Sequence, residues 1–116
     1  MRWARLLANV ECRLRRGGWY RVLRLEPVEA VLDVQAKPVI VLLPFLEIRQ
    51  TPPSSWTVVA RPANAVNLPP SWGREYAVCP NCRHRARLPG HPKRLRCERC
   101  HHEFAVAWDE HYQPVL

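Results

Sequence analysis

Four of the five cysteines in this 116-residue chain form two C-x-x-C pairs, a spacing at which two thiolates can hold one metal ion. The first pair is CPNC at residues 79–82 and the second is CERC at 97–100, with fourteen residues between them. Tetrahedral zinc takes four such ligands from two short loops, and iron occasionally occupies the same kind of cage. The sequence therefore predicts a structural zinc site with four protein ligands and no open position. The expected ligands are Cys79, Cys82, Cys97 and Cys100.

The second pair also permits another interpretation, because residues 97–102 are CERCHH and C-x-x-C-H is the attachment sequence of c-type haem. Haem attachment requires an oxidising compartment, but residues 1–14 lack the apolar core and cleavage site of a signal peptide. Haem would also leave the CPNC pair without a role. We therefore favour zinc, and expect a cytoplasmic protein whose cysteines are thiols or metal ligands.

The cysteine segment resembles the zinc-ribbon family, whose pattern is C-P-x-C…L-P…R-C-x-x-C-x-x-x-F. The matching residues are Cys79, Pro80, Cys82, Leu88, Pro89, Arg96, Cys97, Cys100 and Phe104. The resemblance implies two zinc knuckles on a small antiparallel sheet. Knuckles of this family usually have glycine directly after the second cysteine, whereas this chain has Arg83 and His101. We expect the backbone at these two positions to be strained or differently turned.

The net charge is +8, and most of it lies in two blocks. Residues 1–25 contain seven arginines and one glutamate, and residues 79–104 contain seven Lys/Arg and two glutamates. Such blocks favour a polyanionic partner, and we expect nucleic acid or an RNA- or DNA-containing complex. The alternatives are a solvated basic surface or a face that docks on an acidic protein. The candidate contacts are Arg13, Arg15, Arg16, Arg83, Arg85, Arg87, Lys93, Arg94, Arg96 and Arg99, with Arg83, Arg85 and Arg87 expected on one strand face.

The first half of the chain alternates short β-rich runs with turn signals, which predicts a mainly β fold. The expected strands are 8–14, 19–25, 28–34, 39–43 and 56–60, with a brief edge at 44–49. About five strands in this length resemble a small SH3-like or Tudor-like barrel; an OB-like barrel and, if residues 3–14 are helical, an α+β fold are alternatives. The run 39–43 is apolar on both faces and is expected to be the most buried strand. Cys12 is expected to be a small core residue.

The predicted organisation is a small five-stranded SH3-like barrel followed by a zinc ribbon with four cysteine ligands. The boundaries are 1–61 for the barrel, 62–75 for a proline-rich connector, 76–108 for the ribbon and 109–116 for a tail. Trp56 and Trp108 are expected to pack in cores, whereas Trp19 and Trp72 are equally suited to packing and to base stacking. The longest apolar run, at 39–46, is broken by Pro44 and too short for a membrane span.

No sequence feature indicates catalysis. The chain has no phosphate loop, no paired carboxylates and no nucleophile beside a base. The sequence thus favours a non-catalytic zinc-binding module that binds nucleic acid through basic surfaces. The alternative is a structural or adaptor subunit of a larger protein complex, for which the small modules and the Trp- and Pro-rich connector are suited.

Overall fold

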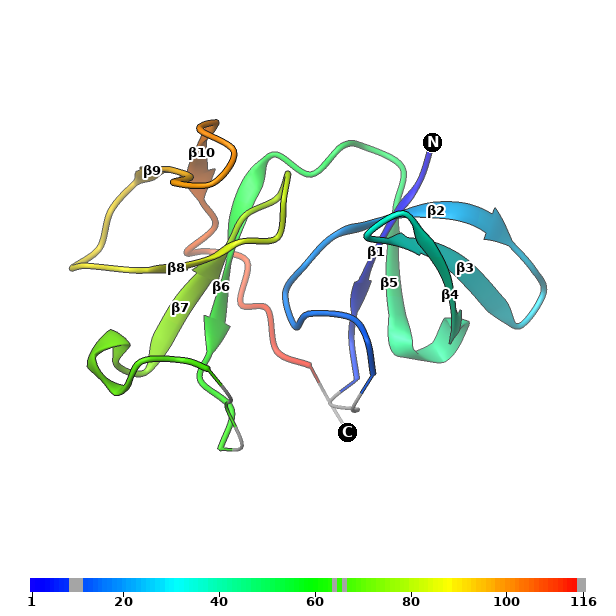
Figure 1. Ribbon diagram of the computed structural model, residues 1–116, viewed down its shortest axis with the longest axis horizontal. Helices are drawn as coiled ribbons and strands as arrows, with labels where there is room; N and C mark the ends of the chain where they lie inside the picture. The colour runs from blue at the N-terminus through cyan, green and yellow to red at the C-terminus, as the bar shows by residue number, and fades with distance from the viewer. Residues whose placement is uncertain (9–11, 64, 66, 115–116) are drawn as a thin grey trace. The chain divides into compact units, whose positions relative to one another are not determined.

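The computed structural model describes residues 1–8, 12–63, 65 and 67–114, and these residues form a mainly β structure (Figure 1). They contain ten strands in two five-stranded sheets and two short 3-10 helices. Two compact units result, one containing Met1–Pro53 and the other Ser54–Gln113. The predicted mainly β fold class is confirmed. Across the described ranges, no helix has the length and apolar character needed to cross a membrane.

The first unit is one antiparallel sheet with the strand order β4-β3-β2-β1-β5. Its strands are β1 (Trp3–Leu6), β2 (Tyr20–Leu25), β3 (Glu29–Val34), β4 (Lys37–Leu42) and β5 (Leu46–Arg49), and a 3-10 helix at Leu43–Phe45 joins the last two. All five strands contribute side chains to one core cluster, which requires the sheet to curl around that core. The cluster contains Ala4, Leu6, Leu14, Tyr20, Ala30, Leu32, Val41 and Leu46.

The first strand differs from the prediction, because β1 is Trp3–Leu6 and not 8–14. Residues 9–11 of the expected strand lie outside the described residues, and Cys12–Leu14 form a bend. Cys12 is exposed, so its expected core position is wrong. In β1, Ala4 and Leu6 face the core, and Arg5 between them is also buried, at 2% exposed.

The prediction that 39–43 is the most buried strand is also wrong. β4 lies at an edge of the sheet, where Val39 and Val41 face the core. Ile40 and Leu42 point to the other face and are 63% and 49% exposed. An apolar run buries both faces only if another layer covers the second face, and sequence alternation cannot report that layer.

The second unit has the strand order β8-β7-β6-β10-β9. Its strands are β6 (Ser55–Ala60), β7 (Glu75–Val78), β8 (Arg85–Arg87), β9 (Arg94–Arg96) and β10 (Glu103–Val106). The β6–β10 pairing is parallel, and the other pairings are antiparallel. β6 corresponds to the strand expected to end the barrel at residue 61, but it pairs with β7 and β10, and the unit boundary falls after Pro53. Its pattern indicated a strand without indicating its partners.

β6 is covered on both faces. Trp56 and Val58 point to a cluster that includes the ribbon cysteines, while Val59 points to a second cluster with Tyr76 and Val78. The second cluster also holds Leu68 and Trp72 from the proline-rich segment and Tyr112 from the tail. Leu68 and Trp72 of the predicted connector and Tyr112 of the predicted tail therefore pack in the second unit; residues 64, 66, 115 and 116 lie outside the described residues.

Candidate metal centre

The four predicted ligands converge at one point. Each C-x-x-C pair lies in the turn of a hairpin, the first between β7 and β8 and the second between β9 and β10. The four sulfur atoms all lie within 4.8 Å of one another, with 3.7 Å between Cys79 Sγ and Cys100 Sγ and 3.5 Å between Cys82 Sγ and Cys97 Sγ. A tetrahedron with Zn–S bonds of about 2.3 Å places its sulfurs about 3.8 Å apart. The donor set and its spacing fit a metal ion, with zinc the best match.

The two hairpin turns have the same backbone hydrogen bonds. In the first, Cys79 N donates to His84 O at 2.9 Å, and Arg83 N donates to Cys79 O at 3.0 Å. The second turn has the same two bonds: Cys97 N donates to His102 O at 2.8 Å, and His101 N donates to Cys97 O at 2.9 Å. An amide also points at the first sulfur of each pair, from Asn81 at 3.4 Å and from Cys100 at 3.5 Å. Such N–H groups stabilise thiolate charge.

Arg83 and His101 have positive φ angles of 65° each, in the left-handed region that glycine adopts most easily. The strain expected from the missing glycines is present, but the turns are not differently shaped, because the paired hydrogen bonds are kept. The knuckle geometry therefore tolerates side chains at both positions, with a backbone penalty.

The metal centre is continuous with one hydrophobic core. Cys79 and Cys97 are fully buried in the cluster with Trp56, and Cys82 and Cys100 are partly buried against it. Nε1 of Trp56 donates to the Leu95 carbonyl at 3.0 Å, which connects β6 to β9. The predicted packing role of Trp56 is confirmed, and Trp108 packs on the same cluster.

The thiols differ in acidity when no metal is bound. Burial raises the pKa of Cys79 well above its usual range and also raises the pKa of Cys82. Burial acts in the same direction on Cys100, but hydrogen bonds from Asn81 and His102 outweigh it and lower that pKa to about 5. A metal ion must therefore displace protons from Cys79 and Cys82 at neutral pH, whereas Cys100 offers a thiolate.

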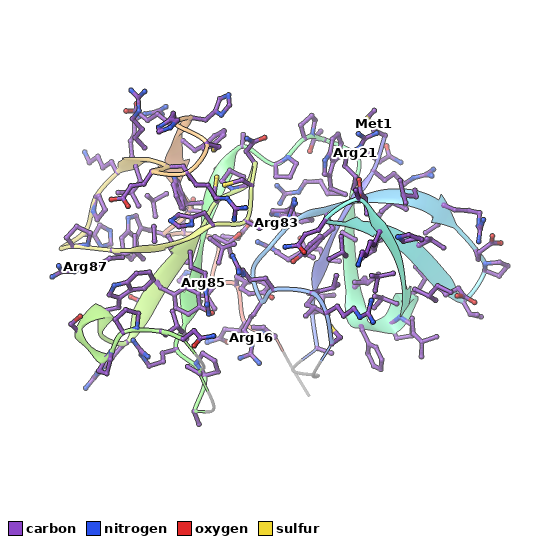
Figure 2. The ribbon with its side chains drawn as sticks, viewed as in Figure 1. Met1, Arg16, Arg21, Arg83, Arg85 and Arg87 are labelled. Carbon is purple, nitrogen blue, oxygen red and sulfur yellow. The ribbon has the colours of Figure 1, made fainter. Side chains whose placement is uncertain are left out.

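The predicted basic contacts are divided between the two units. The seven in the ribbon are Arg83 and Arg99 in the knuckles, Arg85 and Arg87 in β8, Lys93 before β9, and Arg94 and Arg96 in β9. Arg13, Arg15 and Arg16 belong to the first unit. Figure 2 shows Arg83, Arg85 and Arg87 following one another along the segment that enters β8. Only Arg85 and Arg87 share a strand face, because Arg83 lies in the turn before the strand begins.

Comparison of the chain with protein-family models, with curated proteins and with solved structures gave no match. The assignment of a metal centre therefore depends on the four cysteines and their geometry.

Proposed function

We propose that this protein is a non-catalytic module that holds one structural zinc ion and binds nucleic acid, or a nucleic-acid-containing assembly, through the basic surface of its second unit. The zinc part is supported by the four thiols, which fill a tetrahedral shell and leave no position for substrate or water. Zinc would bridge the two hairpins, which lie at opposite ends of the sheet order. The resemblance to a zinc ribbon agrees with this role.

The observation that supports nucleic-acid binding is the concentration of seven Lys/Arg residues on the knuckles and edge strands of one small sheet. Arg87, Lys93, Arg96 and Arg99 are exposed. Arg94 pairs with Glu103 at 2.9 Å, but both side chains are more than half exposed, so this pair is weak and phosphate can compete for the arginine. Phosphate contacts of this kind give affinity without base specificity.

The test is a titration of the zinc-loaded full chain against labelled RNA and duplex DNA over a series of salt concentrations. We expect the logarithm of the binding constant to fall linearly with the logarithm of salt concentration, because each phosphate contact releases a counterion. Absence of binding at low salt, or binding that does not respond to salt, would contradict the proposal.

A second candidate function, a protein-docking or adaptor role, is favoured by the exposed apolar side chains of the first unit. Leu23, Val28, Ile40 and Leu42 are between 49% and 63% exposed, and Ile40 and Leu42 lie on the same outer face of β4. A stoichiometric protein complex that survives nuclease and is lost in Ile40→Lys, but not in the exposed control Gln50→Lys, would support this function. If the complex is unaffected by Ile40→Lys, the outer face of β4 is not the docking surface.

A further inference from the structure

The second sheet is open: among the described residues, its two edge strands are not paired with each other. β8 and β9 are its two outer edges, yet only residues 88–93 connect them along the chain. So short a connection brings the two edges near each other at that end. A groove of about 570 Å³ is lined by residues of both edges and by Trp72. It is as large as pockets that hold small organic ligands.

The groove has a strongly basic lining. Arg85 and Arg87 contribute from β8 and Arg96 from β9, against one acidic residue, Glu98. Arg87 and Arg96 are exposed, so their guanidinium groups are accessible to a ligand. Guanidinium groups recognise phosphate oxygens, so this lining favours a polyanionic ligand.

Trp72 provides an aromatic surface beside these arginines. It packs against the cluster containing Tyr76 and Val78, but it is only partly buried and also lines the groove. The segment that carries it is held in place by Arg61, whose guanidinium and Nε donate to the carbonyls of Leu68, Pro69 and Gly73 at 3.4, 2.6 and 2.7 Å. The indole is thus pre-positioned, and a base stacked on it would not have to order the segment.

An added peptide strand suits these edges poorly. β8 and β9 are three residues long and carry outward charges, features that oppose strand addition. A flexible polyanion with planar groups satisfies both the arginines and the tryptophan. In a duplex the bases are stacked inside, where Trp72 cannot reach their faces.

We propose that the groove between β8 and β9 binds single-stranded nucleic acid, with a base stacked on Trp72 and the flanking phosphates on Arg87 and Arg96. The inference rests on the proposed function and deepens it by naming the strand state of the ligand and its site. Stacking on an aromatic side chain is tolerant of base identity, so we expect little sequence preference.

The experiment compares a short oligouridine, an oligothymidine and a duplex of equal length, by fluorescence anisotropy with the zinc-loaded full chain. We expect the single strands to bind about tenfold more tightly than the duplex. Trp72→Ala should weaken single-strand binding about tenfold and leave duplex binding unchanged, while Trp72→Phe, which keeps a stacking ring, should retain most of the affinity. Zinc content and circular dichroism establish that each variant is folded. If Trp72→Ala does not fold, the affinity of Trp72→Phe still tests the stacking.

The contribution of the arginines is tested with Arg87→Gln. Arg74→Gln is the matched control, since Arg74 is exposed in the same unit and lies outside the groove. Arg87→Gln should weaken single-strand binding more than Arg74→Gln does. Three results would contradict the groove as the binding site without contradicting nucleic-acid binding. They are equal effects of the two arginine substitutions, equal affinity for single strand and duplex, and a folded Trp72→Phe variant whose single-strand affinity falls about tenfold. No binding to any of the three probes would instead overturn the proposed function itself.

Discussion

Arg83 and His101 occupy equivalent positions in the two C-x-x-C turns, and each has a backbone φ of 65°. Each donates its amide to the carbonyl of the first cysteine of its pair, so the turn requires this left-handed conformation. For a residue with a Cβ the conformation costs roughly 1–2 kcal/mol. Two copies of one strained turn therefore lie at the candidate metal centre.

Replacing His101 with glycine should stabilise the zinc-loaded protein, because glycine adopts the left-handed region without a Cβ clash. We expect a gain of about 0.5–1 kcal/mol, after allowing for the larger entropy of glycine in the unfolded chain. The gain is measured as a shift in the chemical denaturation midpoint of the zinc-loaded chain. His101→Ala is the control, since alanine keeps the Cβ; an equal gain with alanine would show that the imidazole, and not the backbone, is responsible.

Removing the metal should unfold the second unit selectively. Cys79 and Cys97 share a core with Trp56, and a metal ion held by all four thiols would connect the two hairpins, so its removal would break that connection. Metal binding contributes about 10–16 kcal/mol in zinc-finger peptides, more than so small a sheet gains from burial. Hydrogen exchange after chelation should show lost protection in β7 and β10 and retained protection in β2 and β3.

Metal analysis of the wild type and two cysteine variants tests which cysteines hold the metal. Wild type should contain one zinc per chain, Cys97→Ser should lose it, and Cys12→Ser should keep it because Cys12 lies outside the cluster. A metal-free protein whose β7 and β10 amides stay protected would show that the site is not structural.

Zinc affinity should fall as the pH falls. Burial raises the pKa values of Cys79 and Cys82, so these thiols are protonated at neutral pH before metal binds and must release protons on binding. Raising the proton concentration opposes that release, and the stability supplied by zinc is lost on the acid side. Calorimetry in buffers of different ionisation enthalpy measures the released protons. A proton count of zero at neutral pH would contradict the acidities assigned to these two thiols.

In the first unit, the ion pair of Arg5 with Glu47 should matter more than that of Arg24 with Glu26. The distances are 2.8 and 2.6 Å, but the Arg5 side chain is 3% exposed and the Arg24 side chain 68%. Glu47→Gln removes a carboxylate charge 2.8 Å from the buried guanidinium and should cost about 1–2 kcal/mol, less than a fully buried pair because Glu47 is 31% exposed. Glu26→Gln should cost at most about 0.5 kcal/mol.

The stabilities of both variants can be compared by hydrogen exchange in β1 and β5, the strands that Arg5 and Glu47 connect. Equal losses would show that burial of Arg5 does not strengthen its ion pair. Arg5 also lies 4.4 Å from the centre of the Trp19 ring, so an Arg5 substitution would disturb more than its ion pair and is the less informative choice.

The metal centre was predictable because each half of it is formed by residues that are close together in the sequence. A C-x-x-C turn places two sulfurs together through four consecutive residues, and the two turns needed only to meet. The strands over 20–25, 29–34 and 37–42 were also predictable, since alternation and turn residues are local signals. The missed features depend on distant partners.

The burial of Arg5 was not predictable, because Glu47, with which it pairs, comes 42 residues later. β6 looked like the last strand of the first unit because a strand pattern does not identify the sheet. The groove beside Trp72 required knowing that β8 and β9 are the two edges of one sheet. Each of these is a question of which segments meet, which periodicity does not answer.

The parallel pairing of β6 with β10 has a consequence for how the chain is made. Ser55 pairs with Ala105, about fifty residues later, so β6 has a neighbour on one side only until β10 is available. The second C-x-x-C pair is likewise synthesised just before β10. During translation the first unit can therefore form on its own, while the second stays open, with a bare β6 edge and the thiols of Cys79 and Cys82 without their second pair. We expect the emergence of residues 97–106 to complete the second sheet and to cover the β6 edge, which would otherwise be open to pairing with other chains.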